Sequence, residues 1–261
     1  MTPEDINHLN DKGFCIIQNK ISSEWITKIK NTLPEVFDLH YQTQIKHNNE
    51  NTIPGVALNI LLNHQLFINF LEYLLGIGLI DDIKKHFFKS NFILNSFSAL
   101  NNIPNKQNFS RLVHRDIRAY SGKIPILLNM LVMLDDFTSD NGSTLLLPHS
   151  HKKDEVPSDE EFHKNCIKTL GKSGDVLLFN GNLFHASGLN QTDKGRMALP
   201  LTFTKSFYKQ LMDYPRALGY KRINEFSEPI QQLLGYHARV PANLDEWYQA
   251  DDKRFYKKNQ D

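Results

Sequence analysis

The stretch Arg111-Leu112-Val113-His114-Arg115-Asp116-Ile117 places a histidine and a carboxylate two positions apart. Successive side chains on an extended strand point to opposite faces, so His114 and Asp116 would lie on the same side of such a strand. A mononuclear non-haem Fe(II) site uses two histidines and one carboxylate on one side of the ion and leaves the other positions open. The stretch therefore predicts two of three metal ligands, and a second histidine must come from elsewhere in the chain.

The best candidate for that histidine is His185, which ends the stretch Gly-Asp-Val-Leu-Leu-Phe-Asn-Gly-Asn-Leu-Phe-His at 174–185. This pattern predicts a strand over 175–179, followed by a loop that carries the histidine. The small residues that come next, Ala186, Ser187 and Gly188, would leave room around a metal and a bound co-substrate. The chain has 11 histidines, and His185 alone could be an ordinary loop residue, so the assignment depends on this setting.

An arginine follows at the head of another apolar run. Arg196 opens the run 197–203, which predicts a buried strand. A buried arginine needs an anionic partner because an unpaired buried charge is very unfavourable. The planar guanidinium fits a carboxylate through two parallel hydrogen bonds. A metal triad with such an arginine suits a 2-oxo acid, whose keto acid end would bind iron and whose far carboxylate would meet Arg196.

The composition narrows the class of protein. The chain has 261 residues with 40% hydrophobic content, which is enough for one large domain or two small ones. Its 30 basic and 29 acidic residues give a formal net charge of +1, so we expect neither nucleic acid nor a membrane as a partner. Two cysteines, Cys15 and Cys166, do not make a disulfide framework. The sequence lacks a secretory signal and a run of about 20 apolar residues, and we expect a soluble cytoplasmic protein.

Hydrophobic periodicity predicts helices and then short strands divided by turn clusters, which favours a barrel or sandwich over alternating βα units. A helix should start at Thr2-Pro3 and stop at Gly13, and a second should follow Ser22 and end or kink at Pro34. Residues 40–56 are polar and rich in Asn and His, so we expect a surface loop there. The remaining predicted elements are helices at 58–75 and 229–234 and strands at 14–17, 92–100, 126–134 and 144–147.

Several motifs follow the H-x-D pair in a fixed order. They are Asn-Gly-Ser-Thr-Leu-Leu-Leu-Pro-His-Ser-His-Lys at 141–152, Gly-Asp-Val-Leu-Leu-Phe at 174–179, His-Ala-Ser-Gly-Leu-Asn at 185–190, and Arg196. Together with the opening stretch at 13–22, this order resembles the phytanoyl-CoA dioxygenase family from residue 10 to about 205. One departure is Pro148-His149-Ser150, where that family usually has Pro-Gly-Ser; the added side chain could close the loop or line the pocket.

The resemblance implies a mainly β fold with flanking α-helices. Its core would be a double-stranded β-helix (a cupin-like jelly roll) over roughly 87–205, with helices packed outside. A helical N-terminal part at 1–86 and a C-terminal extension at 206–261 would complete a single domain spanning 1–261.

The resemblance also implies an Fe(II)- and 2-oxoglutarate-dependent dioxygenase that uses O2 and forms succinate and CO2. His114, Asp116 and His185 would hold the iron, and Arg196 would hold the C5 carboxylate of 2-oxoglutarate. Asn129 and Ser187 are weaker candidates for contacts with the co-substrate, and a structural hydrogen bond is an equal alternative for both. Related halogenases have Gly or Ala at the carboxylate position, so Asp116 favours hydroxylation of a small organic substrate, although desaturation or ring closure would use the same ligands.

Two other functions stay open at this stage. The chain could be a non-catalytic binding or scaffold protein on the same fold, which the intact ligand set argues against. It could also be a cupin-like metal enzyme that does not use 2-oxoglutarate, which Arg196 argues against. The substrate could be an acyl thioester, a sugar, an amino acid or a natural-product intermediate, and the protein could be a monomer or a homodimer.

Overall fold

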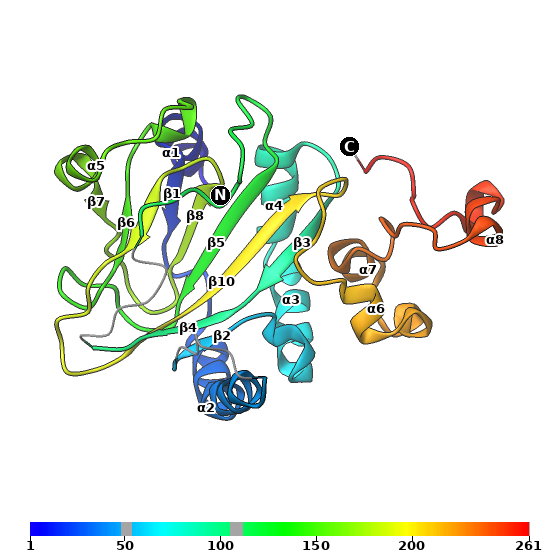
Figure 1. The fold of residues 1–261 in the computed structure, drawn as a ribbon, viewed down its shortest axis with the longest axis horizontal. Coiled ribbons are helices and arrows are strands. Elements are labelled where there is room, and N and C mark those ends of the chain that lie inside the picture. Colours follow the sequence, from blue (N-terminus) through cyan, green and yellow to red (C-terminus); the bar gives the residue numbers. More distant parts are fainter. Residues whose placement is uncertain (48–53, 105–111, 261) are drawn as a thin grey trace.

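The computed structural model describes residues 1–47, 54–104 and 112–260. Two antiparallel sheets with flanking helices make up this part of the chain (Figure 1). The large sheet has seven strands in the order β1-β8-β5-β10-β4-β2, with β3 also pairing with β10, and the small sheet has the order β7-β6-β9. The expected architecture of antiparallel sheets flanked by helices is confirmed.

The strands are short apart from the two at the centre of the large sheet. They are β1 (Phe14–Ile17), β2 (Val56–Ala57), β3 (Phe92–Phe97), β4 (Ala99–Asn102), β5 (Leu127–Met133), β6 (Thr144–Leu146), β7 (Ile167–Lys168), β8 (Val176–Asn180), β9 (His185–Ser187) and β10 (Arg196–Lys205). The α-helices are α1 (Pro3–Lys12), α2 (Ser23–Lys46), α3 (Gln65–Gly76), α4 (Leu79–Ile83), α5 (Asp159–Asn165), α6 (Tyr214–Leu218), α7 (Glu228–Leu234) and α8 (Leu244–Trp247). Strands were predicted at the positions of β1, β5, β6, β8 and β10, and helices at those of α1 and α7, and all are present with ends that differ by at most two residues. The single strand predicted at 92–100 is instead divided into β3 and β4.

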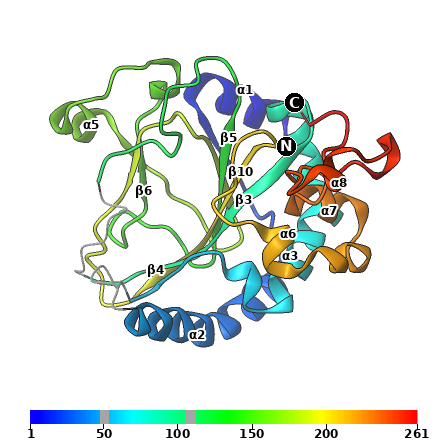
Figure 2. The same ribbon diagram turned by 45° about the vertical axis from the view of Figure 1, so that its right-hand side comes forward.

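Strand β5 shows how the large sheet separates two environments. It is buried along its whole length, between β8 and β10. Leu128, Met130 and Val132 belong to a core cluster shared with α2, α3 and α7, whereas Leu131 and Met133 belong to a second cluster that includes Leu146 of β6. The period of two therefore directs one face of the sheet to the helices and the other to the small sheet. In Figure 2, α3 and α7 lie on one side of the central strands β5 and β10, and β6 lies on the opposite side.

Strand β10 repeats this alternation and contains a proline in its middle. Leu199, Leu201 and Phe203 pack in the core with the helices. Pro200 lies where the partner of β10 changes from β4 to β3, and its carbonyl oxygen accepts the Ser98 N–H at 2.8 Å. Proline cannot donate a hydrogen bond, so it is tolerated at this interruption of the ladder.

Helix α2 corrects two predictions. It runs without a break from Ser23 to Lys46, so Pro34 lies inside the helix rather than at its end. Ile26, Ile29, Leu33 and Val36 keep one buried face through the proline, and this burial offsets the lost backbone hydrogen bond. The loop expected at 40–56 is helical at 40–46, because extending an existing helix is much easier than starting one; residues 48–53 lie outside the described ones.

The helix expected over 58–75 is also different. Residues 60–62 form a short 3₁₀ turn, and the α-helix begins only at Gln65, with the His64 side chain accepting the Leu66 N–H. Asn59 has a φ of 58°, in the left-handed region, and its Oδ1 accepts a hydrogen bond from the Tyr214 hydroxyl at 3.0 Å. A left-handed residue cannot lie inside an α-helix, so the helix starts later than its apolar pattern suggests.

The start and end of α1 are well defined. Thr2 caps it, as its sequence predicted, and forms a capping box with Asp5. Its last carbonyl groups are satisfied by the segment that follows β6. The His149 N–H donates to the Lys12 carbonyl oxygen at 3.0 Å, and His149 Nδ1 donates to the Asp11 carbonyl oxygen at 2.9 Å. His151 Nε2 donates to a third carbonyl of this helix end, and the two segments are thus joined through backbone groups.

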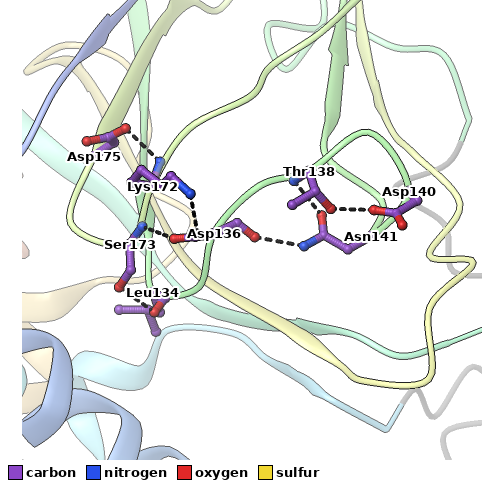
Figure 3. Close-up of polar contacts among 8 residues, drawn as sticks. All are labelled: Leu134, Asp136, Thr138, Asp140, Asn141, Lys172, Ser173 and Asp175. Carbon is purple, nitrogen blue, oxygen red and sulfur yellow. Dashed lines mark hydrogen bonds and ion pairs between the residues drawn. The ribbon is translucent and has the colours of Figure 1, made fainter.

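The loops that follow β5 and precede β8 are joined by a polar cluster around Asp136 (Figure 3). Its carboxylate accepts hydrogen bonds from Lys172 Nζ at 2.8 Å and from the Ser173 N–H at 2.9 Å. Its carbonyl oxygen accepts the side chain of Asn141 at 2.7 Å. These contacts hold neighbouring strand ends together and fix the turn that leads to Gly142.

None of the helices within the described ranges combines the length and apolar content needed to cross a bilayer. Cys15 and Cys166 are both free thiols. Cys15 is buried, and this burial raises the pKa of its thiol to about 12.

Candidate metal centre

The segment that carries His114 and Asp116 is irregular, which corrects the strand predicted for it. Within 112–119, only His114 makes a β-type bridge, and its partner is His185. The His114 N–H donates to the His185 carbonyl oxygen at 3.0 Å, and the His185 N–H donates to the His114 carbonyl oxygen at 2.9 Å. His185 is the first residue of β9 rather than part of a loop. The two histidines are therefore direct neighbours across paired backbones.

The side chains of His114, Asp116 and His185 converge. One ligand atom from each lies within 4.8 Å of the others. His114 Nε2 is 3.7 Å from Asp116 Oδ1, and His185 Nε2 is 3.5 Å from Asp116 Oδ2. Two imidazoles and one carboxylate at this spacing can hold one metal ion. The structure thus brings together the three residues predicted as ligands.

Both imidazoles are oriented in the same way. His114 Nδ1 lies 2.7 Å from the Leu112 carbonyl oxygen, and His185 Nδ1 lies 3.1 Å from the Leu183 carbonyl oxygen. A carbonyl oxygen only accepts hydrogen bonds, so Nδ1 carries the proton in each neutral ring. The unprotonated Nε2 atoms then face the shared centre, the arrangement in which histidine binds metals.

Burial differs across the centre. The exposed fraction of the His185 side chain is 10%, against 37% for His114 and 32% for Asp116. Burial lowers the pKa of His185, while the negative charge of Asp116 acts in the opposite direction. The neutral, metal-binding form of His185 is therefore favoured, and the centre is accessible from the side of His114 and Asp116.

Asn129 and Ser187, the two weaker candidates, both lie beside the centre. Asn129 Nδ2 donates to Asp116 Oδ2 at 2.7 Å, and Asn129 Oδ1 accepts the Thr202 hydroxyl at 3.1 Å. Ser187 Oγ accepts a hydrogen bond from Asn102 Nδ2 at 3.3 Å. Each residue thus makes a hydrogen bond within the protein, and a co-substrate contact by either one stays a prediction.

Arg196 lies at the start of β10, with 4% of its surface exposed. One terminal nitrogen donates to the Gly142 carbonyl oxygen at 2.7 Å, and the guanidinium carbon lies 4.0 Å from the centre of the Phe137 ring. In the described residues, its Nε has no hydrogen-bond partner. Burial lowers the pKa of Arg196 to about 10, and the charge of Asp135 acts in the opposite direction.

Asp135 does not serve as a direct partner for Arg196. Its carboxylate is engaged by Lys30 Nζ and by the Met197 N–H, the latter at 2.7 Å. Within the parts of the chain that the structure describes, no carboxylate forms an ion pair with Arg196. The result is a buried cation with an unused donor, a site that would be stabilised by an anionic ligand.

One cavity of about 360 Å³ joins the triad to Arg196. It lies between the two sheets, and the alternation of β10 directs Arg196, Pro200 and Thr202 into it. Apolar side chains provide much of its wall: Leu100, Leu127, Leu131, Phe179 and Ala186. At its mouth Leu58 and Leu211 line the cavity although they are 53% and 68% exposed. The cavity thus connects the three convergent side chains to the buried cation.

Sequence reasoning did not assign roles to several residues around the centre. Arg115, between the two ligands, is directed away from the cavity and packs on the Phe184 ring at 4.1 Å. Its guanidinium donates to the carbonyl oxygens of Lys153 and Asp154 at 3.1 and 3.2 Å. The alternation of the H-x-D stretch would have placed Arg115 on the opposite face, but nothing local indicated its partners. The same holds for Thr202 and for the rim residues Leu58 and Leu211.

Comparison with known proteins agrees with this geometry. The sequence model described as "Phytanoyl-CoA dioxygenase (PhyH)" matches residues 9–198. The chain belongs to the phytanoyl-CoA dioxygenase family. The family match includes the three convergent side chains and Arg196.

Relatives of this family member match between about half and most of its length. An uncharacterized protein of Mycobacterium tuberculosis is 37% identical over 199 residues, which cover 74% of this chain and 71% of the relative. Dioxygenase olcK of Penicillium canescens is 25% identical over 259 residues, covering 87% of this chain and 78% of the relative. Dioxygenase sphC of Aspergillus fumigatus is 30% identical over 145 residues, covering 51% and 38%. The dioxygenase names of olcK and sphC support an oxygenase.

The structure explains one departure from the usual family pattern. His149 replaces the glycine of Pro-Gly-Ser, and its φ is 66°, in the left-handed region that favours glycine. Histidine is among the residues that tolerate this conformation, and its hydrogen bond to the end of α1 adds a local compensation. The imidazole thus fastens this loop to α1 instead of entering the cavity around the triad.

Proposed function

We propose that this protein is an Fe(II)- and 2-oxoglutarate-dependent dioxygenase that hydroxylates a small organic substrate. The observation that carries the proposal is the placement of His114, Asp116, His185 and the unpaired cation of Arg196 in one cavity. We also propose that the chain forms one domain with a double-stranded β-helix core. Two sheets that face each other with the centre between them support that fold.

The donor set suits Fe(II). Both imidazoles present unprotonated Nε2 atoms to the centre, and Asp116 contributes the single carboxylate, which leaves other coordination positions for co-substrate and O2. When bound there, Fe(II) with 2-oxoglutarate supplies the oxidising chemistry. One O2 and one 2-oxoglutarate convert a substrate C–H to C–OH and yield succinate and CO2, with one oxygen atom in the hydroxyl group and the other in succinate.

The protein's own task at Arg196 is to hold the co-substrate in one direction. Its pKa of about 10 keeps the guanidinium protonated at neutral pH. Packing on Phe137 and the hydrogen bond to Gly142 fix its plane, and the free donors can receive the C5 carboxylate of 2-oxoglutarate. Such fixed positioning aligns the reacting groups before reaction.

The apolar cavity wall has a separate task. Leu100, Leu131 and Phe179 line the cavity shared by the triad and Arg196, and they would exclude water from the reacting groups. The mouth at Leu58 and Leu211 gives the substrate an apolar entrance, with Tyr208 and Arg118 as polar groups nearby. The substrate carbon to be hydroxylated would lie between this mouth and the triad.

An anaerobic titration tests the proposal. Apo-protein receives Fe(II) and then 2-oxoglutarate, while the weak visible metal-to-ligand charge-transfer band is followed. We expect the band with the natural chain and with His163→Ala, whose histidine lies on α5 with its Nδ1 bonded to Asp159. We expect no band with His114→Ala or Asp116→Ala.

Each other outcome identifies a different function. Fe(II) binding without a band would favour a metal enzyme that does not use 2-oxoglutarate. Absence of metal binding in the natural chain would overturn the enzyme proposal and favour a binding or scaffold role. A band that persists in both ligand variants would place the metal elsewhere.

A further inference from the structure

A hydrogen-bonded relay connects the centre of the large sheet to the ligand Asp116. Thr202 and Asn129 are directly opposite each other in the pairing of β10 with β5. The Thr202 hydroxyl lies 3.1 Å from Asn129 Oδ1, and Asn129 Nδ2 lies 2.7 Å from Asp116 Oδ2. Asn129 is 5% exposed and lies on β5, which is buried along its whole length.

The chemistry of the partners fixes the direction of this relay. An ionised carboxylate only accepts hydrogen bonds, so the amide nitrogen of Asn129 must face Asp116. Its amide oxygen then faces Thr202, whose hydroxyl donates to it. A donor bound to an ionised acceptor makes one of the stronger hydrogen bonds in proteins, and the distance of 2.7 Å agrees with this.

Asp116 needs such a tether more than the two histidines do. His114 and His185 are held by their reciprocal backbone bonds and by their Nδ1 contacts. Asp116 lies in the irregular segment, outside any strand, with 32% of its side chain exposed. A carboxylate on such a segment would otherwise populate several rotamers. The entropy lost on ordering it would then make metal binding less favourable.

We infer that Asn129 is a positioning residue that holds the Asp116 carboxylate ready for the metal, and that Thr202 holds Asn129 in turn. This inference rests on the proposed metal site. It assigns Asn129 to the metal ligand rather than to 2-oxoglutarate. Loss of a group that orients a metal ligand lowers metal affinity about 10- to 100-fold, so this is the effect expected for Asn129.

The test compares three variants in the apo-protein. Asn129→Leu keeps similar volume and removes both hydrogen bonds. Thr202→Val removes only the outer one. Thr204→Val is the matched control, because Thr204 lies on the same strand but its hydroxyl donates to the Ile126 carbonyl oxygen at 2.9 Å. That carbonyl still accepts the Lys205 N–H in the control.

Co(II), a spectroscopic substitute for Fe(II), is titrated into each protein and followed by calorimetry and visible absorption. Thermal unfolding of each apo-protein is measured separately. We expect the Co(II) dissociation constant to rise about 10- to 100-fold in Asn129→Leu and less in Thr202→Val, with a changed visible spectrum in both. Thr204→Val should bind Co(II) as the natural chain does.

The outcomes separate this inference from the proposed function. If the natural chain binds no Co(II), the metal site itself fails and the inference fails with it. If the natural chain binds and a folded Asn129→Leu binds equally well, only the inference is overturned. It is also overturned if Asn129→Leu loses affinity for 2-oxoglutarate at saturating Co(II) while its Co(II) affinity is unchanged. If Asn129→Leu does not fold, the test depends on Thr202→Val. An unchanged Co(II) affinity and an unchanged visible spectrum in Thr202→Val would then overturn the inference.

Discussion

His114 and His185 exchange both of their backbone hydrogen bonds, at 3.0 and 2.9 Å, and their ring centres lie 4.2 Å apart. The separation of the two imidazoles is therefore set by the main chain. Side-chain packing has only to choose the rotamer, and each Nδ1 contact to a carbonyl does so. Two of the three donors are preorganised before any metal arrives.

A preorganised centre should stabilise the fold when it binds metal. At a free Co(II) concentration 100 times the dissociation constant, binding adds about 2.7 kcal/mol to the free energy of unfolding. For a chain of this length that raises the melting temperature by about 5–10 °C. His185→Ala should remove the increase and His163→Ala should keep it. Differential scanning fluorimetry with and without Co(II) measures both, and an equal rise in His185→Ala would place the binding elsewhere.

We expect Arg196 to contribute to ligand binding and not to the stability of the fold. In Arg196→Met the buried charge disappears, and the Gly142 carbonyl oxygen still accepts Asn102 Nδ2 at 3.1 Å. We expect the free energy of unfolding of the apo-protein to be unchanged or about 1 kcal/mol higher, because a buried charge without a partner is unfavourable. Affinity for 2-oxoglutarate should fall about 10- to 100-fold, the effect of losing charge-assisted hydrogen bonds worth roughly 1.5–3 kcal/mol.

Urea unfolding and calorimetric titration with 2-oxoglutarate measure the two properties of Arg196→Met. Arg196→Lys is the matched variant, since it keeps the charge and loses the planar fork. A large loss of stability in Arg196→Met, with 2-oxoglutarate affinity retained, would show a purely structural arginine.

Because the backbone at His149 is left-handed, we expect replacement by alanine and replacement by glycine to change stability by different amounts. His149→Ala keeps the unfavourable φ of 66° and loses the Nδ1 bond to Asp11, so it should lower the free energy of unfolding by about 1 kcal/mol. His149→Gly loses the same bond but removes the backbone strain, and it should be about 1 kcal/mol more stable than His149→Ala. Chemical denaturation of both variants checks the order. Equal stabilities would mean that the loop does not adopt this conformation in solution.

His151 should make the fold sensitive to mild acid. It is buried against the end of α1, its Nε2 donates to the Asn10 carbonyl oxygen, and its Nδ1 lacks a partner among the described residues. Burial lowers the pKa of His151, and the positive charges of Lys152 and His149 lower it further. The hydrogen bond to Asn10 and the charge of Asp11 raise this pKa but do not outweigh the burial. Protonation in the folded state would place an unpaired donor in the interior.

The direction in which the free energy of unfolding changes with pH follows from the difference in protons bound by the folded and unfolded states. Between the lowered folded pKa and the unfolded value near 6.5, the unfolded state binds more protons, so stability increases with pH in this window. Above the window His151 contributes nothing, and below 6.5 stability falls by at most about 1.4 kcal/mol per pH unit from this residue. Urea unfolding at pH 7.5 and 5.5 should show a smaller loss in His151→Gln than in the natural chain. Equal losses would show that His151 titrates alike in both states.

The fold was predictable wherever local pattern and tertiary packing agree. The apolar run at 126–134 became β5 and the run at 197–204 became β10, because strands buried on both faces have few other structures available. Pro34 and residues 40–46 were misjudged, since local propensity indicated an end and the buried face of α2 carried the helix further. The late start of α3 depends on the partner of Asn59, Tyr214, which lies far away in the sequence.

The metal-ligand side chains of the site could be predicted from the sequence, but the residues that hydrogen-bond to these ligands could not. The H-x-D spacing placed His114 and Asp116 on one side even though their segment is not a strand. The partners of Asn129 come from β10 and from the irregular segment, and no local pattern relates these three pieces of chain. Hydrogen bonds between distant segments depend on the register of the sheet, which a single sequence does not specify here.

The rim of the cavity has a consequence for how this protein can diverge. Leu58 precedes α3 and Leu211 follows β10, so the apolar entrance is built outside the strands that hold His185 and Arg196. We expect substitutions at the two leucines to alter which molecules enter, while the spacing of the histidines, fixed by main-chain bonds, stays constant. In the function proposed above, oxidation and substrate selection would therefore be encoded in separable parts of the chain.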